Sequence, residues 1–186
     1  MRPFARAFLL PLVLVCASAA AETPAERRAE ISKRSSEVLQ RLYKVHPSAR
    51  GAIAKAHGYA VFTNLGVNLV LISAAAGNGL AHNNKTGKST YMKMISAGVG
   101  FGLGVKDFRG IFIFDNEKSL EQFVNKGWEA GAHADAVAKA GKEGGALEGA
   151  VTVAPGVRLY QLTENGLALE ATIQGTKYFK DDDLNK

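Results

Sequence analysis

The side chains that could carry catalysis or bind a metal ion are few in this sequence. His133 and Asp135 lie two residues apart, so they would share one face of a strand, and His82 is a third candidate. Structural zinc takes four ligands, and a serine hydrolase of the common type places its serine in a G-x-S-x-G motif, which is missing here. We therefore expect no metal site, no cofactor and no catalytic centre.

Glycine alternates with apolar residues in SAGVGFGLGVKD, residues 96–107. A dinucleotide-binding loop needs G-x-G-x-x-G, and here the third glycine comes one residue early and a turn follows. A membrane helix needs about 20 apolar residues, but only 12 uncharged residues separate Lys93 from Lys106. The spacing therefore predicts a strand over 98–105 with one bare face. Either a helix or the acyl chain of a ligand would cover that face closely.

Residues 23–46 are expected to form a basic amphipathic helix. Thr23, Pro24 and Glu26 make a capping box with proline at the first helical position. Apolar and small side chains then recur at helical spacing, at Ile31, Ser35, Val38, Leu39, Leu42 and Val45. The other face carries the basic side chains of Arg27, Arg28, Lys33, Arg34, Arg41 and Lys44. A second, short helix should run from Pro47 to His57.

The chain from about 59 to 179 is expected to be rich in strands. Strands are predicted over 59–63, 67–73, 89–96 and 111–114, with turns at 83–88 and 107–110. Asp115 is expected to cap a helix over about 116–126. TENG, residues 163–166, predicts a hairpin turn, and the charged tail 180–186 should be frayed. The fold class is then α+β: a glycine-rich, curved antiparallel sheet with N-terminal helices and one inserted helix packed on it.

Residues 1–21 have the layout of a secretory signal peptide. Arg2 and Arg6 precede an apolar run, and Ala19 and Ala21 occupy the A-x-A positions, so cleavage is expected after Ala21. Lipidation of Cys16 is the alternative. The mature chain would be one domain, residues 22–186, in the periplasm or secreted, without a transmembrane span. It keeps 21 Lys and Arg against 17 Asp and Glu, and this charge is too small to indicate nucleic acid.

The order of these pieces resembles the SYLF-domain family, in particular its exported bacterial members. The resemblance covers roughly residues 35–183. It rests on the basic helix, on the glycine-alternating segment, and on an ordered set of short motifs. These motifs are Gly77-Asn78-Gly79, Asp115-Asn116-Glu117-Lys118, Asp135, Gly166-Leu167 and Gly175-Thr176-Lys177-Tyr178.

What the resemblance implies is non-catalytic binding of membrane lipid. Eukaryotic members bind phosphoinositides through a basic amphipathic segment, and some associate with actin patches. Carried over by position, the lipid-binding residues would be Lys33, Arg34, Arg41, Lys44, Arg50 and Lys55. The expected partner is anionic membrane lipid of unspecified identity, bound peripherally. The alternative is a structural or protein-interaction domain of the cell envelope that uses the same basic helix.

Overall fold

The structure is a computed structural model, and it describes residues 22–65, 74–97, 109–129, 149–163, 166–168 and 175–186. Several sequence expectations lie outside these residues. They are the signal peptide over 1–21, the strand over 67–73, the glycine-alternating strand over 98–105, and the candidates His133 and Asp135.

Three helices occur in the described residues: α1 (Pro24–Val45), α2 (Ala49–Lys55) and α3 (Glu117–Lys126). The capping box at the start of α1 is confirmed, because the Thr23 side chain accepts from the backbone N–H of Glu26 and the Glu26 carboxylate accepts from Thr23. The predicted apolar stripe of α1 is buried from Ile31 to Leu42. Val45 is the exception, since 47% of it is exposed. The stripe therefore ends one turn before the helix does.

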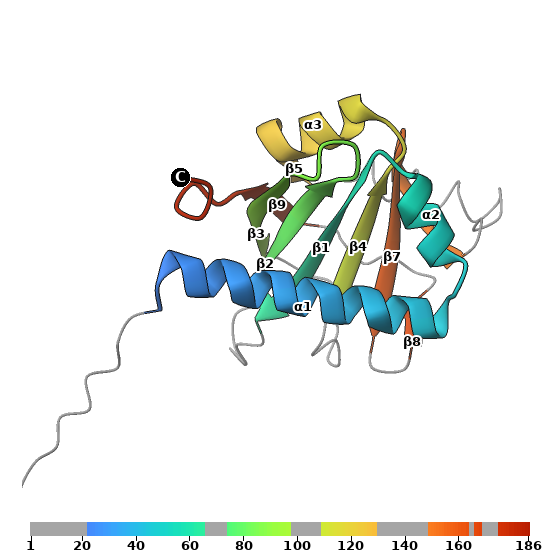
Figure 1. The fold of residues 1–186 in the computed structure, drawn as a ribbon, viewed down its shortest axis with the longest axis horizontal. Coiled ribbons are helices and arrows are strands. Elements are labelled where there is room, and N and C mark those ends of the chain that lie inside the picture. Colours follow the sequence, from blue (N-terminus) through green and yellow to red (C-terminus); the bar gives the residue numbers. More distant parts are fainter. Residues whose placement is uncertain (1–21, 66–73, 98–108, 130–148, 164–165, 169–174) are drawn as a thin grey trace, which may run out of the picture.

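Nine strands of the described chain form one antiparallel sheet (Figure 1). They are β1 (Gly58–Leu65), β2 (Ala74–Asn83), β3 (Ser89–Ala97), β4 (Arg109–Phe114), β5 (Trp128–Glu129), β6 (Val151–Ala154), β7 (Val157–Thr163), β8 (Gly166–Ala168) and β9 (Thr176–Lys180). Their order is β5-β9-β3-β2-β1-β4-β7-β6, and β8 also pairs with β7. The predicted hairpin around 163–166 is confirmed by the β7–β8 pairing, in which Thr163 is opposite Gly166.

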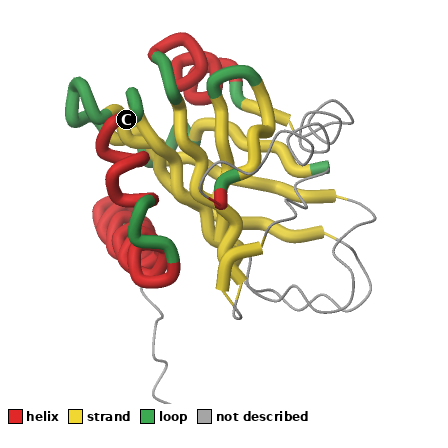
Figure 2. The backbone as a smooth tube through the Cα atoms, turned by 90° about the vertical axis from the view of Figure 1, so that its right-hand side faces the viewer, coloured by secondary structure: helices red, strands yellow, loops and turns green. Residues whose placement is uncertain are grey.

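The sheet is curved (Figures 1 and 2), and a hydrophobic core lies on each of its faces. Alternate residues point to opposite faces, so Val61 and Ile111 lie beneath α1 and α2 while Phe62 and Phe112 lie beneath α3. The α3 face is aromatic, and the rings of Phe62 and Tyr178 are 4.7 Å apart. The predicted α+β fold class, with N-terminal helices and one inserted helix on a curved antiparallel sheet, is confirmed.

The start of α3 differs from the sequence prediction. Asn116, rather than Asp115, caps the helix, and its side-chain oxygen accepts from the backbone N–H of Ser119 at 3.0 Å. Asp115 instead forms an ion pair with Arg158, 2.6 Å apart. The expected turn at 107–110 is also wrong at its end, because Arg109 and Gly110 already belong to β4. Pairing with β1 and β7 extends this strand beyond its apolar residues.

The charged C-terminal tail is packed on the domain, and the expectation that it is frayed is wrong. Leu184 is buried against Ile31 of α1 and Leu80 of β2. The Asp181 carboxylate is buried too, and it pairs with Lys93 at 3.1 Å and with Arg27 at 3.5 Å. Asn185 donates to the backbone oxygen of Tyr91 at 2.7 Å. One buried leucine, two ion pairs and one hydrogen bond thus outweigh the charge of this segment.

Leu184→Ala is expected to lower the free energy of unfolding by about 2 kcal/mol, at the low end of the range for buried leucines. Leu184 is 1% exposed, but only a small cluster surrounds it. Chemical denaturation measures the change. A loss below about 0.5 kcal/mol, which is typical of surface positions, would show that the tail is not docked in solution.

Candidate functional site

Helix α1 presents its basic side chains outward because its apolar stripe is already covered. Leu42 is fully buried and Val38 is 4% exposed, and both pack with α2 and with the α1-facing side of the sheet. In Figure 1, α1 runs across the strands as a single long helix. The stripe is therefore not available to a membrane, and only the outer face of the helix can contact one.

The outer face of α1 brings three of the predicted site residues onto one shallow surface. We call this the α1 basic surface; it is made by Lys33, Ser36, Glu37, Gln40, Arg41 and Lys44. Lys33 and Lys44 are exposed, and Arg41 is half-buried. Neither lysine has an ion-pair partner within the described ranges. With Glu37 as the one acid, the surface carries a formal net charge of +2.

Arg34 contributes less charge to this face than the sequence suggests. Its Nε atom donates to Glu30 Oε1 at 2.6 Å, one turn earlier in the helix. An i,i+4 pair of this kind stabilises a helix by only a few tenths of a kcal/mol. It does, however, neutralise the guanidinium locally, so Arg34 is a weaker candidate for contact with an anion than Lys33 or Lys44.

Arg50 lies at the corner between α1 and α2. Its guanidinium carbon is 4.4 Å from the centre of the Tyr43 ring, in a cation–π contact. Burial raises the pKa of Tyr43, and the positive charge of Arg50 opposes that increase. The contact fixes Arg50 beside the last turn of α1 while leaving it exposed.

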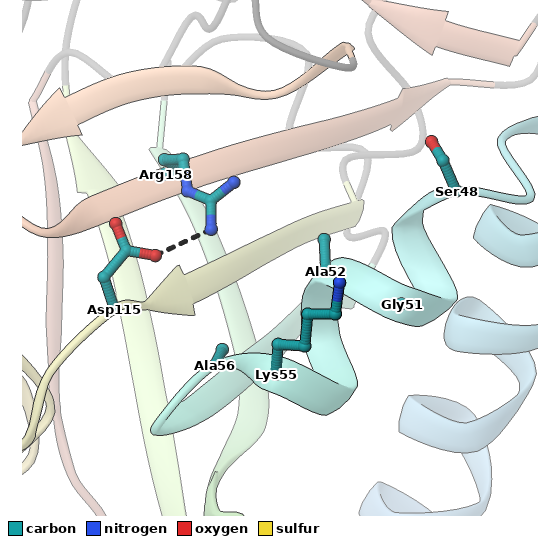
Figure 3. A pocket seen from close by; sticks show the side chains of 7 residues that line it. All are labelled: Ser48, Gly51, Ala52, Lys55, Ala56, Asp115 and Arg158. Carbon is teal, nitrogen blue, oxygen red and sulfur yellow. Dashed lines mark hydrogen bonds and ion pairs between the residues drawn. The ribbon is translucent and has the colours of Figure 1, made fainter.

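Lys55 lies apart from the α1 basic surface. It lines a groove of about 330 Å³ between α2 and the ends of β4 and β7, which we call the α2 groove (Figure 3). Asp115 and Arg158 form the opposite wall. Neither was predicted as a site residue. The available signal was Arg158 itself, the one charged residue in the strand VRLYQLT.

The first two arginines of α1 serve the fold rather than a binding surface. Arg27 pairs with the buried Asp181, and Arg28 Nη1 donates to the backbone oxygen of Leu184 at 3.2 Å. Both contacts hold the C-terminal tail against the start of α1. The basic face of the helix is thus divided between a structural half and an outward-facing half.

His82 and Ser89 form a pair that resembles part of a catalytic triad. They are opposite each other in β2 and β3, with His82 Nδ1 and Ser89 Oγ 2.9 Å apart. Partial burial lowers the pKa of His82 and so favours the neutral form of the ring. Among the described residues no carboxylate contacts His82, whereas a triad needs one to orient the ring. The pair is a cross-strand hydrogen bond beside the Tyr59 ring.

No helix among the described residues is both long enough and apolar enough to cross a membrane. No group of three or more His, Cys, Asp or Glu side chains in the same residues is arranged to bind a metal ion.

The chain is similar to a described family and to a curated protein. The family model described as Ysc84, Las17-binding protein actin regulator, matches residues 95–186. A curated relative, Beta cell expansion factor A of Aeromonas veronii, is 39% identical over 165 residues, which are 89% of this chain and 61% of the relative. The chain therefore spans about three fifths of that relative's length.

Proposed function

Since residues 95–186 of this chain belong to the Ysc84 family, the SYLF-domain family that its sequence resembles, we propose that the protein is a non-catalytic module that binds anionic membrane lipid through the α1 basic surface. One observation carries this proposal. Helix α1 buries its apolar stripe against the sheet and presents Lys33, Arg41 and Lys44 together on its outer face.

The charges of this surface set the expected strength of binding. Each basic residue close to an anionic surface contributes about 1 kcal/mol, and Glu37 offsets roughly one of the three. About 2 kcal/mol remains, which corresponds to roughly a thirtyfold preference for anionic over neutral lipid. The buried stripe adds nothing, so the association is peripheral, weak and electrostatic.

The compartment belongs to the same proposal. The leader-like residues 1–21 favour export, so the membrane encountered would be the outer face of an inner membrane, the periplasmic face of an outer membrane, or the surface of another cell. We propose a periplasmic or secreted protein that meets phospholipid headgroups from the aqueous side.

Salt dependence provides the first test. The protein should sediment with vesicles of phosphatidylglycerol and phosphatidylcholine at low ionic strength, and the bound fraction should fall steeply as salt is raised. Screening acts over about 10 Å at 0.1 M salt and about 3 Å at 1 M. Pure phosphatidylcholine vesicles serve as the control. Binding that persists at 1 M salt would indicate insertion of apolar groups and would contradict the electrostatic mechanism.

A protein partner is the second candidate function. The description of the matched family names Las17 binding and actin regulation, and the matched residues do not include α1. An interaction domain of the cell envelope would bind its protein partner through the same outer face of α1. Failure of the wild-type protein to sediment with anionic vesicles at low salt would favour this alternative over lipid.

A further inference from the structure

The α2 groove combines small side chains with two cations on opposite walls. Gly51, Ala52 and Ala56 line the α2 side, so the space between helix and strands stays open at about 330 Å³. This volume lies at the lower end of the range for small-molecule sites. Lys55 is on the α2 wall, and the Asp115–Arg158 pair is on the strand wall (Figure 3).

Hydrogen bonds from outside the groove hold both walls in place. The Asn84 side-chain amide donates to the backbone oxygens of Ile53 at 2.8 Å and Ala56 at 3.1 Å, and so fixes the end of α2. On the other wall, the backbone N–H of Asp115 donates to Gly156 at 2.9 Å. Lys55 and Arg158 therefore project from two anchored elements.

The guanidinium of Arg158 is held on one side and open on the other. Its Nη2 atom contacts Asp115 Oδ1 at 2.6 Å, and the other terminal nitrogen points away from Asp115 (Figure 3). Within the described part of the chain, Asp115 is its only ion-pair partner, and its buried Nε atom has no hydrogen-bond partner. One carboxylate contact leaves several of the five N–H groups of this arginine unused.

The α2 wall contributes the second cation. Lys55 is exposed and has no ion-pair partner in the residues that the structure describes. Together with Arg158 and against Asp115, it leaves the groove with a formal charge of +1. Ser48, at the rim, has its hydroxyl 3.0 Å from His46 Nε2.

We propose that the α2 groove binds a phosphate group between Lys55 and Arg158. A phosphate monoester carries close to two negative charges at pH 7 and presents several acceptor oxygens, so it can contact cations on both walls at once. A carboxylate ligand would bring only one charge and two oxygens, and Asp115 already supplies a carboxylate to Arg158. The short side chains of the α2 wall offer no apolar channel, so a headgroup fits the groove and an acyl chain does not.

The phosphate could belong to a lipid headgroup or to a free phosphate compound. The headgroup form rests on the proposed membrane association, because the lipid must first reach the α1 basic surface. Binding of a free phosphate compound does not depend on membrane association. The groove is therefore tested with soluble ligands, and the α1 basic surface is tested with vesicles.

The experiment follows backbone amide shifts of the protein by nuclear magnetic resonance. Inorganic phosphate is titrated against chloride at equal ionic strength, and then short-chain phosphatidic acid against short-chain phosphatidylcholine. Phosphate should shift the amides of Gly51, Ala52 and Ala56, and chloride should not. Lys55→Gln and Arg158→Gln should each weaken the affinity about tenfold, as expected for the loss of one charge-assisted hydrogen bond.

Controls separate the groove from general charge and from misfolding. Lys85→Gln and Lys126→Gln remove exposed lysines from other elements and should leave the phosphate titration unchanged. If Arg158→Gln unfolds the protein, Gly51→Leu replaces it. A Cβ at Gly51 meets nothing within 4 Å, so this side chain should obstruct the groove without removing a charge.

The outcomes divide clearly. Phosphate-specific shifts that the groove substitutions weaken would support the site. If phosphatidic acid causes the same shifts, the ligand is a lipid headgroup. If only inorganic phosphate causes them, the ligand is a free phosphate compound. No phosphate-specific shift, or shifts that survive Lys55→Gln and Gly51→Leu, would overturn the site. Neither result decides whether the α1 basic surface binds vesicles, which the sedimentation experiment tests separately.

Discussion

Gly79→Ala is expected to lower the free energy of unfolding by about 3 kcal/mol or more. A Cβ at this position in β2 would overlap the backbone oxygen of Val61 and lie 2.7 Å from the Phe62 ring. Neither neighbour can move easily, because Val61 and Phe62 belong to the central strand β1 and are fully buried. Overpacking a core costs about 1–3 kcal/mol, and displacing a central strand costs more.

Gly51→Ala is the matched control for this change. It makes the same substitution in α2, where the new Cβ meets nothing within 4 Å. Alanine should stabilise the helix by about 0.5–1 kcal/mol relative to glycine. Denaturant unfolding of both variants gives the comparison. Equal effects of the two substitutions would contradict the close contact between β1 and β2.

Leu42→Ala is expected to lower the free energy of unfolding by about 2–5 kcal/mol. Leu42 is fully buried between α1, α2 and the sheet, so its removal leaves a cavity in that core. Because the side chain does not reach the outer face, the folded fraction should still bind anionic vesicles as the wild type does. Unfolding measured with denaturant, together with sedimentation at low temperature, separates the two effects.

Val45→Ala is the control on the same helix. Val45 lies within one turn of Leu42 but is 47% exposed, so its truncation should change stability by less than about 0.5 kcal/mol. Suppose instead that Leu42→Ala abolished vesicle binding without loss of stability. The stripe would then insert into lipid, and the packing of α1 on the sheet would not persist at a membrane.

The elements governed by local rules could be predicted from sequence. The capping box at Thr23 and the stripe from Ile31 to Leu42 involve residues three or four positions apart, and both were found where predicted. The 83–88 turn is similar, with the Asn83 side chain accepting from the backbone N–H groups of Lys85 and Thr86. Such contacts form within the segment itself and depend little on the rest of the chain.

Strand β2 and the C-terminal tail depended on distant partners. Strand β2 reads AAAGNGLAHN, which has no β-branched residue and no Phe, Tyr or Trp, and it is held by pairing with β1 and β3 on both sides. The tail carries three consecutive aspartates, yet Asp181 is paired with Lys93 and Arg27. Propensity and charge pattern describe a segment on its own and could not identify these partners.

The candidate site was predictable where its residues share one helix, and it was not predictable where they come from distant parts of the chain. Lys33, Arg41 and Lys44 share one helix face, so their spacing places them together. Arg34 has the right spacing but is neutralised by Glu30. The α2 groove joins Lys55 to Asp115 and Arg158, which are themselves 43 positions apart, and only the pairing of β4 with β7 brings them together.

The most direct test of lipid binding by the α1 basic surface is sedimentation of a charge-reversed protein with anionic vesicles. The variant carries Lys33→Glu, Arg41→Glu and Lys44→Glu. Its control carries Lys85→Glu, Lys118→Glu and Lys126→Glu, which reverse three exposed lysines on other elements and give the same net charge. Thermal unfolding first establishes that both are folded. We predict that the α1 variant falls to the level seen with neutral vesicles while the control still binds. Undiminished binding of the α1 variant, or equal loss in both proteins, would contradict the assignment of lipid binding to this surface.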